Sequence, residues 1–260
     1  MTLLRGRNKP TVKLNLRWAS EYLTEPLAEP TFPIDVREHL VELGMMGNDT
    51  YGDCGPVAEV HLEMTTAVAA GGAAVSPDSP LAVNRYVSYT GSETPPGPGV
   101  DLASYLLWCY QRGYIKAFAP VDQSDKAQCQ ALMAAGFGLV IGVNLTDENE
   151  QQFANGQPFD ASAAEPPNPD DGHAVLWGYS ETANGPHAVA TWALWQPTTD
   201  AWINDCLVQN PGGEAFLVVT TEEQLAAFDP ALLADVAALG GSTGGATAPP
   251  SPPEPPSGAE

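Results

Sequence analysis

The hydrophobic pattern changes period once along the chain, and this change most constrains the fold. After Asp53, apolar side chains recur at the spacing of a helix, at Val57, Val60, Met64 and Val68. From residue 137 on, short apolar runs typical of buried strands take over, at Phe137–Val143, His173–Tyr179, His187–Leu194 and Phe216–Val219. Helices followed by antiparallel strands predict an α+β fold, with a helical lobe packed against a sheet lobe.

Capping residues place three further helices in the first half. We expect them to begin near Asp78–Pro80, after Asp101 and after Ser124, and Gly113 and Gly136 would end the last two. The first helix should stop before the glycine pair at residues 71–72.

Acidic residues outnumber basic ones strongly, and their balance limits the partners of the protein. The 260 residues include 32 Asp and Glu against 10 Lys and Arg, for a formal net charge of −22. This charge argues against nucleic acid or an anionic membrane as the main partner of the acidic body. A hydrophobic fraction of 43% argues against global disorder, and the length suits one medium-sized domain or two small ones.

Half of the basic residues lie in a short N-terminal arm that contains no acid: Arg5, Arg7, Lys9, Lys13 and Arg17. We expect residues 1–34 to form this arm and its lead-in, 35–239 to form the folded domain, and 240–260 to form a tail. The arm is either a frayed, solvated terminus or a segment that docks on an acidic surface, such as a neighbouring subunit or nucleic acid. Six of the eight residues from Pro249 to Pro256 are proline, which predicts a disordered or polyproline-II extension.

The sequence shows no secretion signal and no apolar run long enough to span a membrane. We therefore expect a cytoplasmic or virion-associated protein, and its Ala-, Gly- and Pro-rich composition suggests a high-GC bacterium or its phage. The four cysteines lack metal-binding or disulfide spacing, and no cofactor motif is present. Three of them, Cys109, Cys129 and Cys206, lie in helical patterns and are interpreted as structural.

The fourth cysteine, Cys54, lies in the most informative segment of the chain, Gly47-Asn48-Asp49-Thr50-Tyr51-Gly52-Asp53-Cys54-Gly55-Pro56. This polar loop places a thiol at the start of an apolar helix, where the helix dipole stabilises a thiolate. A possible partner is His173, which opens a hydrophobic strand after a long irregular loop. A cysteine nucleophile for acyl transfer needs such a base.

A cysteine at the head of a long helix and a Gly-His-Ala-Val strand more than a hundred residues later resemble the papain-like cysteine peptidases. The segments Gly47-Asn48-Asp49 and Tyr51-Gly52-Asp53-Cys54 also resemble papain-like proteins of bacteria and their phages. The resemblance covers roughly residues 35–220. It implies a helical lobe that carries Cys54, a sheet lobe that carries His173, and an oxyanion site formed by the Asn48 side chain and the Cys54 backbone N–H.

The residue that orients the histidine departs from the family pattern. The family has an Asn just before a Ser-Trp pair, and aligning the chain on Trp192 puts Ala190 at the Asn position. The orienting group is therefore missing, replaced by Thr191 through a register shift, or supplied from elsewhere, for example by Asp200. The aligned Trp192 could shield the histidine.

The other titratable residues are given structural interpretations. His61 is expected to be a packing residue on the first helix, and His187 an exposed residue at the end of a hairpin. The acidic pairs Asp49/Asp53 and Asp170/Asp171 lack a calcium-loop pattern, so a solvated acidic surface is expected there and no metal.

These observations predict a cysteine hydrolase that acts on a peptide or amide bound between the lobes, without a cofactor. The alternative is a papain-like fold that has lost its chemistry and serves as a structural or binding component, for example of a phage particle.

Overall fold

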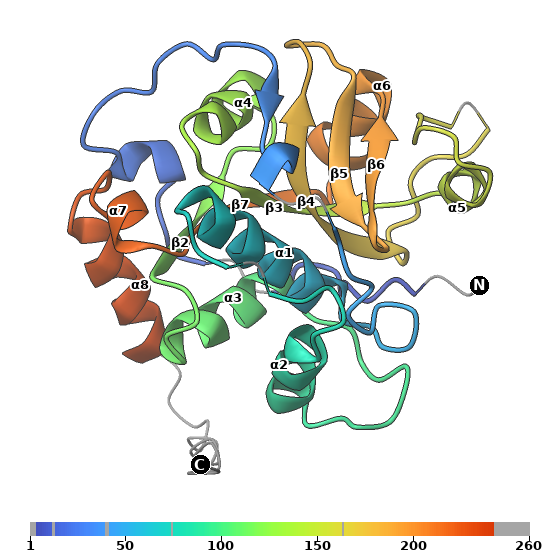
Figure 1. Cartoon of the computed structure of the whole chain (residues 1–260), viewed down its shortest axis with the longest axis horizontal. Coiled ribbons are helices and arrows are strands. Elements are labelled where there is room, and N and C mark those ends of the chain that lie inside the picture. The colour runs from blue at the N-terminus through green and yellow to red at the C-terminus, as the bar shows by residue number, and fades with distance from the viewer. Residues whose placement is uncertain (1–3, 12–13, 40–41, 74, 163, 242–260) are drawn as a thin grey trace.

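A central helix separates a helical lobe from a twisted sheet in the computed structural model of the chain (Figure 1). The structure describes residues 4–11, 14–39, 42–73, 75–162 and 164–241. Most of the predicted tail, from residue 242 on, lies outside this description. The expected α+β fold is confirmed.

Seven strands form one antiparallel sheet within the described residues, in the order β2-β7-β3-β4-β5-β6, with β1 paired to β4. The strands are β1 (Ile34–Asp35), β2 (Ala117–Val121), β3 (Leu139–Asn144), β4 (Gly172–Ser180), β5 (His187–Thr191), β6 (Leu194–Thr198) and β7 (Glu214–Val219). The predicted strand over residues 187–194 is in fact two strands, because the chain reverses at residues 192–193. Strand β2 was not predicted.

The helices are α1 (Cys54–Ala69), α2 (Leu81–Thr90), α3 (Leu102–Gln111), α4 (Lys126–Ala134), α5 (Asp147–Ala154), α6 (Asp200–Ile203), α7 (Glu222–Leu225) and α8 (Ala231–Gly241). Shorter turns are the 3-10 segments Ala19–Tyr22 and Arg37–His39 and the π-helical turn Asn204–Val208. As predicted, Asp101 caps α3, and its carboxylate accepts the backbone N–H of Ser104. Helix α4 is capped by Asp125 and not by Ser124.

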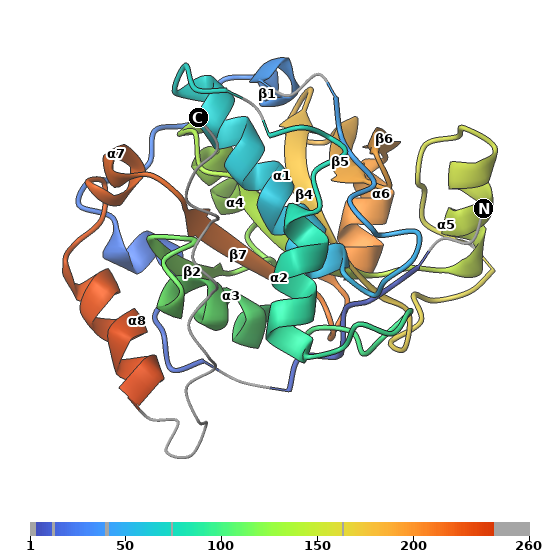
Figure 2. The same cartoon turned by 60° about the horizontal axis from the view of Figure 1, so that its bottom comes forward.

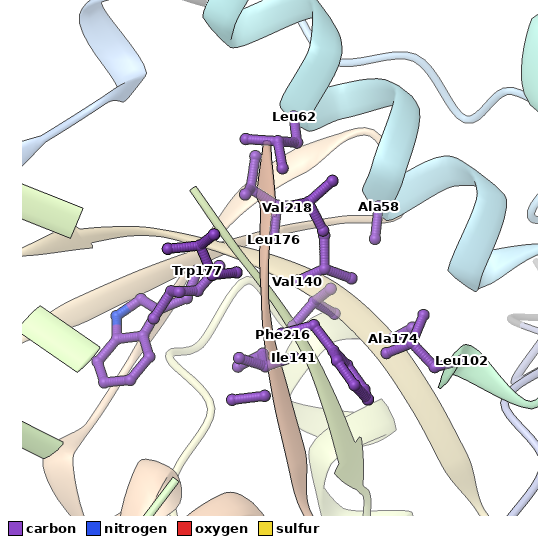
Figure 3. Packing of buried hydrophobic residues seen from close by; sticks show 14 of the residues in the cluster. Ala58, Leu62, Leu102, Val140, Ile141, Ala174, Leu176, Trp177, Phe216 and Val218 are labelled. Atoms are coloured by element: carbon purple, nitrogen blue, oxygen red, sulfur yellow. The ribbon is translucent and has the colours of Figure 1, made fainter. Parts of the chain in front are cut away.

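Helix α1 is the centre of the molecule because it is apolar or small on nearly all sides. Eleven of its sixteen residues are buried. Figure 3 shows Ala58 and Leu62 pointing from α1 to the sheet, where Leu176 of β4 and Val140 of β3 belong to the same core. Burying both faces of the helix between the lobes fixes the position of its first residue, Cys54.

A buried ionic group ties the helical lobe to α1. The Arg85 guanidinium on α2 contacts the Glu59 and Glu63 carboxylates on α1, and the Tyr105 hydroxyl donates to Glu59 at 3.3 Å. Burial raises the pKa of Glu59 to about 8, and the neighbouring Glu63 adds to this effect, whereas the Arg85 charge opposes it. Removal of the Arg85 cation would leave buried acids unpaired, which is energetically costly. The contacts of Arg85 therefore fix the position of α2 relative to α1.

The N-terminal arm is part of the folded structure over residues 4–11. Arg7 is only 4% exposed, and the segment passes the start of α1 in both views (Figures 1 and 2). The expectation of a frayed, solvated arm is therefore wrong for residues 4–7, whereas residues 8–11 are exposed. The basic side chains pair with acids of the same chain, Arg5 with Asp171 at 2.7 Å and Lys9 with Asp170 at 2.7 Å, and docking of the arm on a separate partner stays a prediction.

A search of the described residues for a helix both long and apolar enough to cross a bilayer finds none.

Candidate active site

Cys54 begins α1 directly after the tight polar loop 47–53. The loop turns at Gly47, whose φ of 103° favours glycine and whose carbonyl accepts two backbone N–H groups of the loop. The Cys54 Sγ accepts a hydrogen bond from the backbone N–H of Ala174 at 3.3 Å. Because Ala174 follows His173 on β4, this bond joins the start of the central helix to the strand that carries the predicted base.

His173 is fully buried, and two neighbours fix its ring. Its Nε2 lies 2.6 Å from the Thr191 Oγ1, and the imidazole stacks on the Trp192 indole with ring centroids 4.5 Å apart. Its Nδ1 is buried and has no hydrogen-bond partner within the described residues. One ring nitrogen is thus anchored, and the other is left unpaired.

The strand register explains why Thr191, and not Ala190, lies against the histidine. Trp177 of β4 is directly opposite Val189 of β5, so these two side chains share a face of the sheet. Alternation along each strand puts His173 and Thr191 on that same face and Ala190 on the other. Thr191 therefore occupies the position next to the histidine, which is the second of the three alternatives that the sequence left open.

The turn after β5 explains the misleading alignment on the tryptophan. Trp192 and Ala193 have φ values of 42° and 64°, so the chain leaves the strand immediately after Thr191. One residue fewer separates the polar side chain from the tryptophan than in the family pattern. Trp192 still reaches the imidazole face, as the resemblance implied.

Asn48 lies beside the residue that precedes the thiol. Its side-chain amide donates to the Asp53 Oδ1 at 3.3 Å, and both residues are almost fully buried. The Asp53 Oδ2 is buried without a partner within the described residues. Burial raises the pKa of Asp53 to about 8, although the hydrogen bond from Asn48 acts in the opposite direction.

The N-terminal arm covers the thiol, which no sequence pattern had indicated. The Gly6 backbone amide faces the Cys54 thiol and lowers its pKa, and Cys54 is only 1% exposed. The fit against the loop is close, because a Cβ added to Gly6 would come within 2.1 Å of the Gly52 carbonyl oxygen. Only a glycine can lie in this place without moving the arm.

Backbone hydrogen bonds hold the arm between the two lobes. On the helical side, Val100 N–H donates to the Gly6 carbonyl at 2.7 Å, and Asn8 N–H donates to the Val100 carbonyl at 2.8 Å. On the sheet side, Arg7 N–H donates to the Gly172 carbonyl at 3.1 Å. The arm therefore occupies the passage between the lobes as an extended peptide. One signal in the sequence could have indicated the position of the arm. The first 17 residues of this strongly acidic chain contain five basic residues and no acid.

The covering arm keeps both reactive groups neutral. Burial raises the pKa of the Cys54 thiol to about 11, against the opposing hydrogen bonds from the backbone of Ala174 and Gly6. Burial lowers the pKa of His173 to about 3, and the charges of Arg5 and Arg7 act in the same direction. A thiolate–imidazolium pair is therefore disfavoured while the arm is in place.

The remaining candidate groups lie elsewhere. His187 is buried and not exposed as expected, because its ring bonds Ser180 at 2.9 Å and Asp200 at 3.0 Å. Asp200 is thus engaged away from His173, and the expectation that it might orient that residue is wrong. His61 packs inside the fold as predicted, with its Nε2 3.1 Å from the Gly44 carbonyl.

The acidic pairs are engaged by the chain itself. Asp171 binds Arg5, Asp170 binds Lys9, and Asp53 binds Asn48. In the part of the chain that the structure describes, no group of three or more His, Cys, Asp or Glu residues is arranged to hold a metal ion.

Comparison with solved structures finds this architecture among cysteine proteases. Xylellain, a cysteine protease from Xylella fastidiosa, superposes with a TM-score of 0.56 at 13% sequence identity, over 85% of this chain and 100% of xylellain. Digestive procathepsin L 3 of the Tenebrio molitor larval midgut superposes with a TM-score of 0.56 at 13% identity, over 82% of this chain and 76% of that protein. No family model and no curated protein matches the sequence. The chain therefore has the fold of the papain-like cysteine proteases.

Proposed function

We propose that the protein is a cysteine hydrolase that cleaves a peptide or amide bond through an acyl-enzyme on Cys54. The observation that carries this proposal is the hydrogen bond from the Ala174 N–H to the Cys54 Sγ, which puts the thiol against the backbone of the residue that follows His173. The histidine has one nitrogen anchored by Thr191 and the other unpaired. Nucleophilic catalysis requires an anchored imidazole whose free nitrogen can take the proton of a nearby thiol, and the strand that carries His173 is bonded to Cys54.

Each residue has a separate role in the reaction. Cys54 attacks the carbonyl carbon, while His173 first takes the thiol proton and then gives it to the leaving amine. Water then attacks the thioester, releases the acid product and restores the thiol. Thr191 positions the imidazole and does not itself react.

Asn48 can supply an oxyanion donor. A primary amide carries two N–H groups, and the bond to Asp53 uses one of them. The second N–H and the Cys54 backbone N–H would stabilise the oxyanion of the tetrahedral intermediate, a contribution of about 3–4 kcal/mol per donor in comparable sites.

The arm must leave before a substrate can bind, because it buries the thiol. Its departure would return water to Cys54 and His173 and would remove the Arg5 and Arg7 charges that disfavour an imidazolium. The return of water lowers the thiol pKa and raises the histidine pKa, and the loss of the arginine charges raises the histidine pKa further. The loss of the Arg7 charge acts against the change at the thiol, but burial is the largest cause of the raised thiol pKa, so the net effect favours the reactive ion pair.

The test compares the full chain with its Gly6→Ala variant, in which the added methyl group would collide with the Gly52 carbonyl and displace the arm. An unstructured protein substrate should be hydrolysed faster by Gly6→Ala than by the parent chain. Hydrolysis should be abolished in Gly6→Ala/Cys54→Ala. If the double variant retains the rate of Gly6→Ala, Cys54 is not the nucleophile and the proposal fails.

The burial of the thiol favours a second candidate, a papain-like fold used for binding or structure alone. In that case the arm would be a permanent part of the core, in agreement with the 1% exposure of Cys54. The Gly6→Ala variant separates the two, since a purely structural protein gains no hydrolysis when the arm is displaced.

A further inference from the structure

The Arg7 side chain lies in a buried site built from two strands and the loop before β7. Its Nη1 donates to the Glu214 carboxylate at 2.9 Å and to the Gly212 carbonyl at 2.8 Å. Its Nη2 donates to the Asn144 side-chain oxygen and to the Val143 carbonyl, the latter at 3.2 Å. Four acceptors thus meet the planar fork of one guanidinium, which a lysine ammonium could not match.

A second layer of hydrogen bonds orients these acceptors. The Asn144 amide nitrogen donates to the Asn210 side-chain oxygen at 3.1 Å, which turns the Asn144 oxygen toward the arginine. The same Asn210 oxygen accepts the Gly212 N–H at 2.8 Å. Asn210, which does not itself touch the guanidinium, therefore orients two of its acceptors.

Two glycines make room for the arginine stem. A Cβ at Gly142 on β3 would lie 2.7 Å from the Arg7 Cδ, and a Cβ at Gly172 on β4 would lie 2.3 Å from the Arg7 carbonyl oxygen. The neighbouring strands thus lack side chains where the arm passes. The four acceptors and the space left by the two glycines therefore fit a peptide that has an arginine at the position of Arg7.

The site lies one residue from the reactive thiol. The Gly6 amide faces the Cys54 thiol, and the next residue, Arg7, donates its N–H to the carbonyl of Gly172, which precedes His173. A peptide that follows the path of the arm would therefore place its backbone against the Cys54 thiol. The side chain at the position equivalent to Arg7 would then enter this site.

An empty site would be costly, which makes it selective for a cation. The Glu214 side chain is 12% exposed and faces the only guanidinium that contacts it among the described residues. Burial raises the pKa of Glu214, whereas the Arg7 charge acts in the opposite direction. Removal of the arm would leave this carboxylate without a cation in a low-dielectric place, where it either takes up a proton or pairs with a second cation of matching shape.

We propose that the site formed by Val143, Asn144, Gly212 and Glu214 is a guanidinium-binding subsite of the cleft, filled in cis by Arg7 and able to take the arginine side chain of a peptide in trans once the arm leaves. The inference rests on the proposed function for its meaning as a substrate subsite. The binding itself does not depend on catalysis.

The test uses full-length Arg7→Ala protein, in which the site is empty, and a fluorescent hexapeptide with the sequence of residues 4–9, Leu-Arg-Gly-Arg-Asn-Lys. The control peptide carries citrulline, a neutral shape match, in place of the second arginine. We expect the arginine peptide to bind at least about tenfold more tightly, because only it makes charge-assisted bonds to Glu214. The preference should be lost in Arg7→Ala/Glu214→Gln.

A second measurement guards against misfolding of the alanine variant. Arg7→Ser also leaves the stem space open without a charge and is titrated in parallel with N-ethylguanidinium and N-ethylurea, followed by thermal unfolding. A saturable rise of the melting temperature with the guanidinium alone supports the subsite. If both peptides bind equally or neither binds, and N-ethylguanidinium stabilises neither variant, the subsite does not exist.

The two proposals can fail separately. Arginine-dependent binding without hydrolysis in any Gly6→Ala assay would remove the proposed function and leave the subsite. Hydrolysis by Gly6→Ala that is indifferent to arginine or citrulline next to the cleavage position would do the reverse.

Discussion

The Thr191 hydroxyl lies 2.6 Å from the Nε2 of His173, on the same face of the sheet. A hydroxyl thus holds the imidazole where the resembling peptidases have an amide. Because a hydroxyl both donates and accepts, it is compatible with either tautomer of the ring. It fixes the position of the ring while leaving its protonation state to the environment of the Nδ1.

Replacement of Thr191 by Val keeps the shape of the side chain and removes the hydroxyl. In the Gly6→Ala background, we expect kcat to fall by roughly tenfold to a hundredfold. This loss is no larger than the smallest contribution typical of a general base, because the variant misplaces the base without removing it. Thr191→Ser should restore most of the rate. A positioning role also predicts a change in the pH dependence of kcat, so the measurement is a pH–rate profile of all three proteins. An unchanged profile and rate in Thr191→Val would contradict the role.

We expect the arm to control how fast Cys54 reacts with iodoacetamide at neutral pH. Labelling of the parent chain should be slow, because the thiol is covered and its pKa is raised by burial to about 11. Gly6→Ala and Arg7→Ala should label Cys54 at least about tenfold faster, since the thiolate population rises as the pKa falls. Lys9→Ala is the matched control, because its pair with Asp170 is solvent-exposed and worth less than about 1 kcal/mol.

Peptide mapping by mass spectrometry identifies which cysteine is modified. This matters because all four thiols are buried in the parent chain. Equal labelling of Cys54 in the parent and in Arg7→Ala would show that the arm does not govern access.

Asp53 gives the stability of the protein a defined pH dependence. Its ordinary pKa is 3.8, and burial raises the folded-state pKa to about 8. Between these values the unfolded chain binds fewer protons at this group than the folded chain does. Its contribution to the free energy of unfolding therefore falls as the pH rises from about 4 to about 8, by up to about 1.4 kcal/mol per pH unit, and levels off above.

Asp53→Asn keeps the shape and removes the titration. We expect the stability of this variant relative to the parent to increase steadily from pH 5 to pH 8 in urea unfolding experiments. Parallel stability curves over that range would show that Asp53 is ionised in the folded state.

Arg85 anchors the helical lobe through two acids. Arg85→Ala leaves the buried Glu59 without its cation, and we expect a loss of about 3–5 kcal/mol in the free energy of unfolding. Lys116→Ala breaks the exposed pair with Glu222 and should cost less than about 1 kcal/mol. Urea unfolding of the two variants checks the difference, and a similar small loss in both would contradict the anchoring role.

The parts of the fold that local patterns determine could be predicted from the sequence. The helix after Asp53 and the strands that carry His173 and Phe216 have strong periodicity, and Asp101 is a clear helix cap. The short strand β2, Ala117–Val121, was missed for two reasons. Its residues AFAPV contain a proline, and they do not alternate between apolar and polar.

The candidate site was only half predictable for a similar reason. Cys54 and His173 stand in distinctive local sequences, whereas the neighbour of the histidine depends on strand register, which an alignment on Trp192 misplaced by one residue. The place of the arm depends on contacts between residues more than a hundred positions apart, such as Arg7 with Glu214. Composition indicated only that a basic segment and acidic partners exist.

The central claim, that Cys54 forms an acyl-enzyme assisted by His173, is tested most directly by intact-protein mass spectrometry with an activated ester. The account predicts that Gly6→Ala accumulates one acyl group, mapped to Cys54, which then decays by hydrolysis. In Gly6→Ala/His173→Gln, acylation should slow by about 10²–10⁴-fold, the contribution of a general base. Acylation of Gly6→Ala at other residues, or at Cys54 with the same rate when His173 is replaced, would contradict it.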